Sequence, residues 1–426
     1  MQKVLIIAYY WPPAGGPGVQ RWLNFVKYLP EFGIEPIVYV PENPTYPIQD
    51  ERLVADIPKE VTILKQPIFE PYGLAALFGK KQTKQISSGL IPKQKKQTFL
   101  ERLLLWIRGN LFIPDARKFW VKPSVKYLTG IIKQQQITTL ITTGPPHSVH
   151  LIGQKLKRKS GVTWWADFRD PWTTIGYHKK LKLTRLAANQ HKRLERQILL
   201  AADGLLVTSD KTKLEFQNIT KTPIHVLTNG YEIEPKPTIL DQKFTLAHIG
   251  SLLTDRNPIA LWQALSELVK ENYHFAQELQ LNLIGVVGED IKDSLAFYQL
   301  EDYVTYLGYL GHEEVLEHQA KSQVLLLLEI DSPETQGIIP GKLFEYLIAK
   351  RPILAIGPKY WEAGERVERH QAGRYHIATD KDGIKENLVL WFNAFQNQSL
   401  EVNPINIAQY HRKALTKRLA QLLAWA

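Results

Sequence analysis

The stretch Val324–Pro358 constrains the fold of this chain most, because it reads as strand, loop, short helix and strand in immediate succession. The run Val324–Leu328 is apolar without interruption, which is typical of a parallel strand buried on both faces. Pro352–Ile356 supplies a second such strand directly after the helix. The stretch therefore predicts a βαβ unit and an α/β fold.

The loop of this unit, Asp331–Gly341, must lie at the carboxyl ends of the strands, where open α/β sheets bind ligands. Gly341 opens the helix and places Lys342 in its first turn, with Glu345 about one turn further on. Free backbone N–H groups and the helix dipole favour an anion there. A cation beside a carboxylate suits a nucleoside diphosphate, whose phosphates need a positive charge and whose ribose hydroxyls need an acceptor. The alternative is a pair of ordinary charged residues at a helix start.

The length of 426 residues exceeds one comfortable core and predicts two α/β domains. The segment Glu232–Gln242, with two prolines and little periodicity, is the best boundary. We therefore expect a first domain over residues 1–232, a second over 243–395, and over 396–426 a C-terminal helix that returns toward the first domain.

The first domain opens with a strand, Lys3–Tyr9, a glycine-rich loop, Pro12–Gly18, and a helix from about Val19 with Arg21 in its first turn. Such a loop lets the backbone approach a phosphate or sugar closely, which makes Gly15 and Gly16 candidate contacts. The loop has neither the GxGxxG spacing nor the Walker lysine, which argues against a dinucleotide-binding site and against a P-loop. An ordinary surface turn remains the alternative.

Two later segments of this domain place polar groups where strands end. The strand in VTWWADFRDPW ends in Asp167, Arg169 and Asp170, which are too polar for a strand interior and are expected at the carboxyl edge. His147 and His150 follow the strand Thr138–Thr142 as neighbours on one helical face. We reject a metal pair, because the chain has no cysteine and no clear third ligand is near, and expect one histidine to face the site and the other to be structural.

The second domain repeats the pattern. The strand Phe244–Ile249 runs into GSLLTDRNP, in which Arg256 precedes a helix over Pro258–Lys270, as a phosphate ligand would. A solvent-facing arginine is the alternative. An amphipathic helix over about Ile407–Ala424 closes the chain.

The net charge of +11 is concentrated in one region. Thirteen Lys or Arg and two acids lie between Lys80 and Lys133, so this region alone carries +11. Its basic stretch precedes a helix with Phe99, Leu103, Trp106, Ile107 and Leu111 on one arc, which favours attachment to an anionic membrane surface. The alternatives are a core helix beside a solvated loop, and nucleic acid, for which no motif is present.

Location follows from absences in the sequence. The lack of cysteine is what a reducing cytoplasm permits, and the N-terminus reads as a buried strand instead of a signal peptide. No window approaches the length of about 18 apolar residues that a spanning helix needs. We expect a cytoplasmic protein, peripheral on the inner face of the cytoplasmic membrane.

Several segments together resemble the bacterial family 4 retaining glycosyltransferases of surface polysaccharide assembly. They are GGPGVQRW, TTGPPHSVHLIG with ADFRDPW, LTNGYE, HIGSLLTDRNP and PGKLFEYLIAKRPILAIG, and they cover nearly the whole chain in the family's order. The resemblance implies the GT-B fold, in which two doubly wound Rossmann-like domains face a cleft. It also implies transfer of a sugar from a nucleotide-diphosphate sugar to a saccharide or lipid-linked acceptor.

By the same resemblance, site roles fall on particular residues of this chain. Arg256 and Lys342 would be catalytic and hold the diphosphate, and His147 would lie near the reacting centre. Glu345 would bind the ribose, and the acceptor side would be formed by Arg21, Asp167, Arg169 and Asp170. The remaining donor-binding positions would be Gly15, Gly16, Gly250, Ser251 and Gly337.

One departure from the family concerns its first glutamate, which contacts the sugar eight positions before the ribose glutamate. Gly337 stands there, and the nearest acid is Glu334, a candidate sugar contact if the loop folds differently. Two fixed cations and a helix N-terminus would stabilise the leaving diphosphate, so neither a cofactor nor a metal is expected. The rival functions are a nucleotide-sugar epimerase and a non-catalytic nucleotide-sugar-binding protein.

Overall fold

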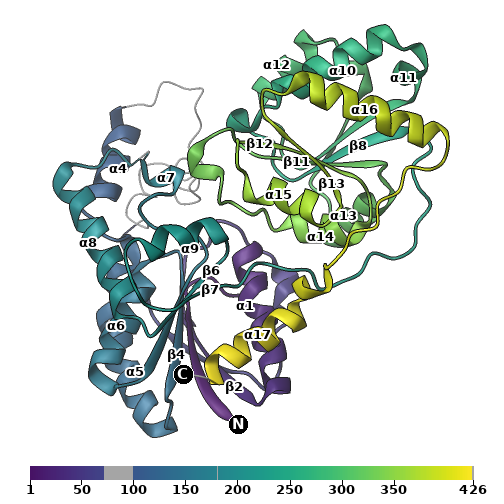
Figure 1. The fold of residues 1–426 in the computed structure, drawn as a ribbon. Coiled ribbons are helices and arrows are strands. Elements are labelled where there is room, and N and C mark those ends of the chain that lie inside the picture. Colours follow the sequence, from purple (N-terminus) through teal and green to yellow (C-terminus); the bar gives the residue numbers. More distant parts are fainter. Residues whose placement is uncertain (72–98, 180, 425–426) are drawn as a thin grey trace. The chain divides into compact units, whose positions relative to one another are not determined.

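The computed structural model describes residues 1–71, 99–179 and 181–424, which form two compact units (Figure 1). Unit 1 comprises Met1–Asn229 together with Arg412–Ala426, and unit 2 comprises Gly230–His411. Each unit is built on one parallel sheet with helices on both faces. Residues 232–243 carry no helix or strand.

The sheet of unit 1 has the order β3-β2-β1-β4-β5-β6-β7, and every pairing in it is parallel. Its strands are β1 Gln2–Ala8, β2 Ile34–Pro41, β3 Thr62–Gln66, β4 Thr139–Gly144, β5 Thr163–Phe168, β6 Gly204–Val207 and β7 Ile224–Val226. Its helices are α1 Pro17–Tyr28, α4 Phe99–Asn110, α5 Val121–Gln135, α6 Ser148–Ser160, α7 Gly176–Lys179, α8 Arg185–Ala201, α9 Asp210–Gln217 and α17 Arg412–Ala424. The strand order reverses between β1 and β4, which makes their carboxyl ends the topological switch point of the unit.

The sheet of unit 2 has the order β10-β9-β8-β11-β12-β13 and is also parallel throughout. Its strands are β8 Phe244–Ile249, β9 Leu279–Ile284, β10 Val304–Gly308, β11 Val324–Leu328, β12 Ile353–Gly357 and β13 Gly373–Ile377. Its helices are α10 Ile259–Glu271, α11 Tyr273–Glu278, α12 Glu289–Phe297, α13 His312–Lys321, α14 Lys342–Ala349, α15 Glu362–Arg369 and α16 Lys381–Gln396. The switch point here lies between β8 and β11.

The strand β11 consists of five apolar residues, and all five are buried, as the sequence predicted for a doubly covered strand. All six residues of β8 are buried as well, including the polar Thr245 and His248. Two clusters of buried side chains line the two faces of each sheet. The core of each unit is therefore its sheet, and charged side chains gather where the strands end.

The closing helix starts later than the sequence indicated. We predicted it from Ile407, but α17 begins at Arg412, because residues 408–410 form a 3-10 turn and His411 is extended. The Tyr410 hydroxyl is bound by Arg366 and His370 of unit 2. From Arg412 on, the chain packs in unit 1, where the Arg412 guanidinium donates to the Gln20 carbonyl of α1 at 2.9 Å and α17 lies along α1 (Figure 1).

Candidate functional site

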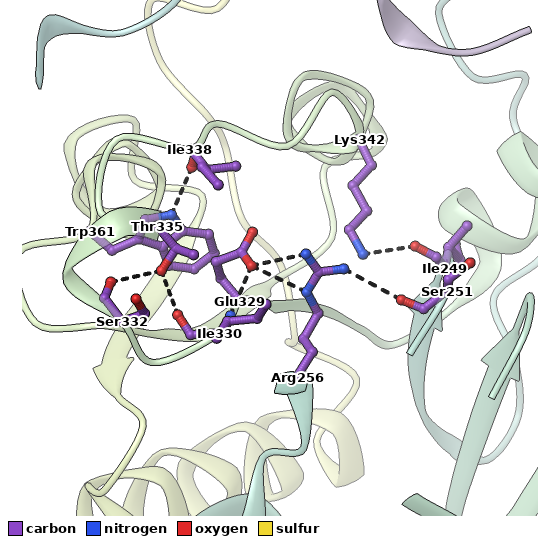
Figure 2. Close-up of polar contacts among 10 residues, drawn as sticks. All are labelled: Ile249, Ser251, Arg256, Glu329, Ile330, Ser332, Thr335, Ile338, Lys342 and Trp361. Carbon is purple, nitrogen blue, oxygen red and sulfur yellow. Dashed lines mark hydrogen bonds and ion pairs between the residues drawn. The ribbon is translucent and has the colours of Figure 1, made fainter. Parts of the chain in front are cut away.

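The carboxyl ends of β8 and β11, which are neighbours in the sheet of unit 2, bring together three charged side chains. Arg256 comes from the loop after β8, Glu329 directly follows β11, and Lys342 is the first residue of α14 (Figure 2). This is the switch point of the unit, where open α/β sheets bind ligands. The structure thus brings the two predicted phosphate ligands to one place.

Lys342 is held by the backbone at the end of β8. Its Nζ donates to the Ile249 carbonyl at 2.8 Å, and it faces Gly250, whose φ of 119° favours glycine. Burial, reinforced by the positive charge of Arg256 and opposed by the Glu329 carboxylate, lowers the pKa of Lys342 to about 7. A half-buried ammonium beside a second cation is well suited to bind an anion, because the anion would relieve their repulsion.

Arg256 is held by Glu329, a residue that the sequence reasoning missed. The Glu329 Oε1 accepts from Arg256 Nη2 at 2.9 Å and Nε at 3.3 Å, and also from the Ile330 amide at 2.8 Å. The Arg256 side chain is 32% exposed and that of Glu329 only 1%. The available signal was an acid directly after an uninterrupted apolar strand, since a charge at that point must lie at the carboxyl edge.

Three further predicted residues of unit 2 come from α14 and from the loop before it. Glu345 is half-buried and accepts from Gln319 Nε2 of α13 at 3.0 Å. Glu334 accepts from the Ser332 hydroxyl within its own turn. Gly337 lies in the loop between this turn and α14, and Trp361 Nε1 anchors that loop through the Ile338 carbonyl at 2.8 Å (Figure 2).

His147 occupies the corresponding edge of unit 1, directly before α6. Its ring is 4% exposed and stacks on Trp172, with the centroids 4.8 Å apart and the planes 3° from parallel. Neither ring nitrogen has a hydrogen-bond partner among the described residues. Burial first, and then the neighbouring His150 and Arg169, hold the pKa of His147 well below its ordinary value, so the imidazole is neutral at pH 7.

His150 has a structural role by comparison. Thr142 Oγ1 lies 2.8 Å from its Nδ1, and its ring stacks on Phe168 with the centroids 4.4 Å apart. Burial lowers the pKa of His150 to about 3. Of the two histidines, His147 is therefore the one with neither ring nitrogen hydrogen-bonded, and both of these nitrogens are buried.

Arg21 and Asp167 are bound to each other inside unit 1. Their ion pair measures 3.0 Å, with side chains only 2% and 0% exposed. Asp167 Oδ2 also accepts from Trp22 Nε1 and from Thr143 Oγ1, each at 2.8 Å, and Arg21 Nη1 donates to the Thr228 carbonyl at 2.7 Å. This network ties α1 to β5 and leaves neither residue open to an acceptor.

Arg169 lies over the glycine-rich loop instead. Its guanidinium donates to the carbonyls of Gly144 and Pro145, and a Cβ on Gly18 would meet its Nη1 at 1.4 Å. Gly16 precedes α1 with a φ of 111°, and nothing lies within 4 Å of where its Cβ would be. Burial raises the pKa of the nearby Asp170. These groups form a second polar edge, at the switch point of unit 1.

In the described part of the chain, no group of three or more His, Cys, Asp or Glu side chains is placed to hold a metal ion. Nor does any helix there have the length and apolar character to cross a membrane.

Comparison with known proteins gives a fold and no closer relation. No family model matches the chain, and no curated protein matches it in sequence. Among solved structures, it is similar to sucrose-phosphate synthase from Thermosynechococcus elongatus, at 12% identity and a TM-score of 0.61, covering 100% of this chain and 99% of the other.

Two further similar structures come from other proteins. One is Anabaena HepE in complex with UDP-glucose, at 13% identity and a TM-score of 0.61, with both chains covered completely. The other is the lipopolysaccharide outer core galactosyltransferase WaaB in its apo form, at 16% identity and a TM-score of 0.59, covering 100% of this chain and 99% of the other. With its two doubly wound parallel sheets, the chain has the GT-B fold.

Proposed function

We propose that this chain is a glycosyltransferase that moves a sugar from a nucleotide-diphosphate sugar to a saccharide acceptor in polysaccharide biosynthesis. The observation that carries the proposal is the pair of cations, Arg256 and Lys342, at the switch point of unit 2. Its support is the GT-B fold together with similar structures whose names include a galactosyltransferase and a complex with UDP-glucose. The sequence resemblance adds retention of configuration and a lipid-linked acceptor.

The chemistry that these residues can supply is charge stabilisation. When the bond from the sugar to the diphosphate breaks, negative charge develops on the leaving phosphate. Arg256, Lys342 and the N-terminus of α14 would stabilise it. Glu345, one turn further along α14, is the proposed ribose acceptor, with Gly250 and Ser251 as backbone contacts of the donor.

From unit 1 we propose His147 and the loop with Gly15 and Gly16 as contacts of the sugar and phosphate, on the strength of the sequence resemblance. The neutral His147, with neither ring nitrogen bonded, can accept or donate a hydrogen bond to a sugar hydroxyl. Arg169 and Asp170 remain proposed acceptor-side groups, and Arg21 and Asp167 would shape that side from within. Glu334 remains the proposed sugar contact on the loop after β11.

The proposal is tested by a panel of UDP-, GDP- and ADP-sugars, first by thermal shift and then by turnover with and without oligosaccharide acceptors. We expect one donor class to raise the melting temperature and to be consumed. Stabilisation without hydrolysis or transfer would identify a binding protein. Conversion of the donor sugar without any acceptor would identify an epimerase.

Transfer is expected to survive chelation. Phosphate charge would be handled by Arg256, Lys342 and the helix dipole, so no divalent ion is needed. The measurement is initial rate with the active donor before and after dialysis against EDTA. Loss of activity that Mg²⁺ or Mn²⁺ restores would contradict this mechanism.

Attachment to the inner face of the cytoplasmic membrane is the remaining part of the proposal. The lysines of the basic stretch up to Lys96 lie outside the described residues. In the described part, Leu105 is the buried side chain of α4, while Leu103 and Trp106 are 41% and 39% exposed. Close by in the chain, Phe69 and Phe119 are exposed and in contact, at 5.7 Å between ring centroids, and the Lys118 ammonium lies 5.5 Å from the Phe119 ring. Exposed aromatic rings beside amines suit an anionic bilayer.

Co-sedimentation with anionic vesicles at low salt is expected for the wild type and is expected to fall at high salt or with neutral vesicles, since each lysine near an anionic surface contributes about 1 kcal/mol. Trp106→Asp should weaken binding without unfolding unit 1, because the side chain is already exposed.

The main test variant changes the basic stretch to Gln at Lys80, Lys81, Lys84, Lys93, Lys95 and Lys96. The control variant changes exposed lysines elsewhere to Gln, at Lys59, Lys221, Lys236, Lys243, Lys350 and Lys359. Equal sedimentation of wild type and main variant in every condition would show that the basic stretch is only solvated.

A further inference from the structure

The two carboxylate oxygens of Glu329 differ in their hydrogen bonds. Oε1 accepts from three N–H groups, on Arg256 Nε, Arg256 Nη2 and the Ile330 amide. Oε2 is buried and has no partner among the described residues. Burial of a carboxylate that is 1% exposed carries a desolvation cost, which the ion pair with Arg256 offsets.

The Glu329 carboxylate fixes the orientation of the Arg256 guanidinium. Glu329 takes the side-on edge of the fork, formed by Nε and Nη2. The remaining nitrogen, Nη1, has only a distant contact with the Ser251 carbonyl, at 3.5 Å. A planar fork fixed along one edge has its orientation determined, so its end-on edge is left for a ligand (Figure 2).

The titratable groups that face Lys342 come from three other segments. They are Arg256 after β8, Glu329 after β11, and His248 within β8. Burial, and then the charges of Lys342 and Arg256, keep the pKa of His248 well below its ordinary value, so the imidazole is neutral at pH 7. Among these groups Glu329 is the one anion, and it favours the protonated form of Lys342.

We propose that Glu329 is a positioning residue of the donor site: it fixes the side-on edge of Arg256 and places a carboxylate beside Lys342. The inference rests on the proposed function, because it assumes that the two cations receive a diphosphate. Glu329 acts through Arg256 and Lys342 and does not itself bind the phosphates. When a diphosphate binds, it balances the two positive charges. Any Lys342 that is still neutral then takes up a proton from the solvent.

The sign of the pH dependence follows from this arrangement. Diphosphate binds the protonated Lys342 better, so affinity is full below pH 7 and falls as pH rises through the pKa of about 7, by up to tenfold per unit. Glu329→Gln removes the charge that favours the ammonium, so the fall begins at lower pH. The ratio of affinities at pH 6 and pH 8 should be at least about twofold larger in this variant than in the wild type. The titration of the ligand itself cancels in this comparison.

The experiment is calorimetric titration of the full chain with UDP, GDP and ADP between pH 5.5 and 8.5. Glu329→Asp keeps the charge but shortens the reach to Arg256, so it should weaken binding at every pH by a similar factor and leave the pH ratio unchanged. Glu267→Gln is the control, since it breaks ion pairs with Lys381 and Lys385 on α16 and should bind as the wild type does.

Each outcome decides a different question. A wild type that binds none of the three nucleotides refutes the proposed function, and with it the premise of this inference. A wild type that binds, with the same pH ratio in Glu329→Gln, or with a loss equal at all pH values, overturns the role of Glu329 and leaves the function intact. If Glu329→Gln does not fold, Glu329→Asp still decides. Wild-type affinity of Glu329→Asp at every pH would refute the proposal, because the shorter side chain cannot hold Arg256 in the same position.

Discussion

Lys342→Ala and Arg256→Ala are each expected to lower kcat/KM, with a loss of about 2–4 kcal/mol in transition-state stabilisation. This is the largest functional effect that we anticipate for single substitutions in this chain. Each removes one positive charge from the place where the leaving diphosphate would gain its negative charge. Both side chains lie at the switch point of unit 2, and each is already oriented by a hydrogen bond, Lys342 to the Ile249 carbonyl and Arg256 to Glu329. No rearrangement is needed before they act, so their loss should appear in kcat as well as in KM.

The measurement is steady-state transfer with the donor that the panel identifies. Lys270→Ala is a matched control, because Lys270 is an exposed cation in the last turn of α10, the helix that follows Arg256. It should leave the rate unchanged. Normal turnover by both site variants would refute the assignment of the diphosphate to this edge of the sheet.

Asp167→Ala is expected to have the largest effect on stability, about 3–5 kcal/mol, because it removes one partner of a buried ion pair. Arg21 would remain as a buried, uncompensated charge. Trp22 Nε1 and Thr143 Oγ1 would each lose their acceptor as well. The substitution therefore strands three donors in the core of unit 1.

Urea unfolding followed by circular dichroism measures this difference. Glu31→Ala is the control, because its ion pair with Lys413 joins side chains that are 46% and 50% exposed, and such pairs contribute about 0–1 kcal/mol. If Asp167→Ala instead unfolds as the wild type does and weakens only acceptor saturation, Asp167 contacts the acceptor and is not a structural anchor.

The sequence alone determined the elements whose cause is local. Val324–Leu328 and Phe244–Ile249 were predicted as strands and are strands over the same residues. For Val324–Leu328 the reason is local, because an uninterrupted apolar run of that length must be covered on both faces. Lys342 was expected in the first turn of a helix and is its first residue, since Gly341 and the loop before it set that start. The GT-B fold was implied by the resemblance of several sequence segments, and the structure has it.

A short strand and several helices escaped sequence reasoning. The strand β13, Gly373–Ile377, carries mostly polar or partly exposed residues at the edge of its sheet, so its sequence has no apolar run to reveal it. It forms because β12 offers a parallel partner from Ile353 to Gly357. The backbone hydrogen bonds to β12 therefore define β13, which has no apolar pattern of its own.

Only the tertiary structure decided how the charged residues are used. Asp167 and Glu329 look alike in the sequence, as acids at the ends of apolar strands. The first is paired with Arg21, 146 positions away, and the second orients Arg256, 73 positions away.

The helix α4 shows the same limit, because Leu103–Ile107 are all apolar and a helical wheel cannot say which side is buried. A Cβ on Gly109 would meet Leu183 at 2.7 Å, so close packing against the segment before α8 selects the side with Leu105 and leaves Trp106 exposed. Apolar runs and turn residues act through neighbours in the chain, whereas the state of a charge or an aromatic ring depends on partners that only folding brings near.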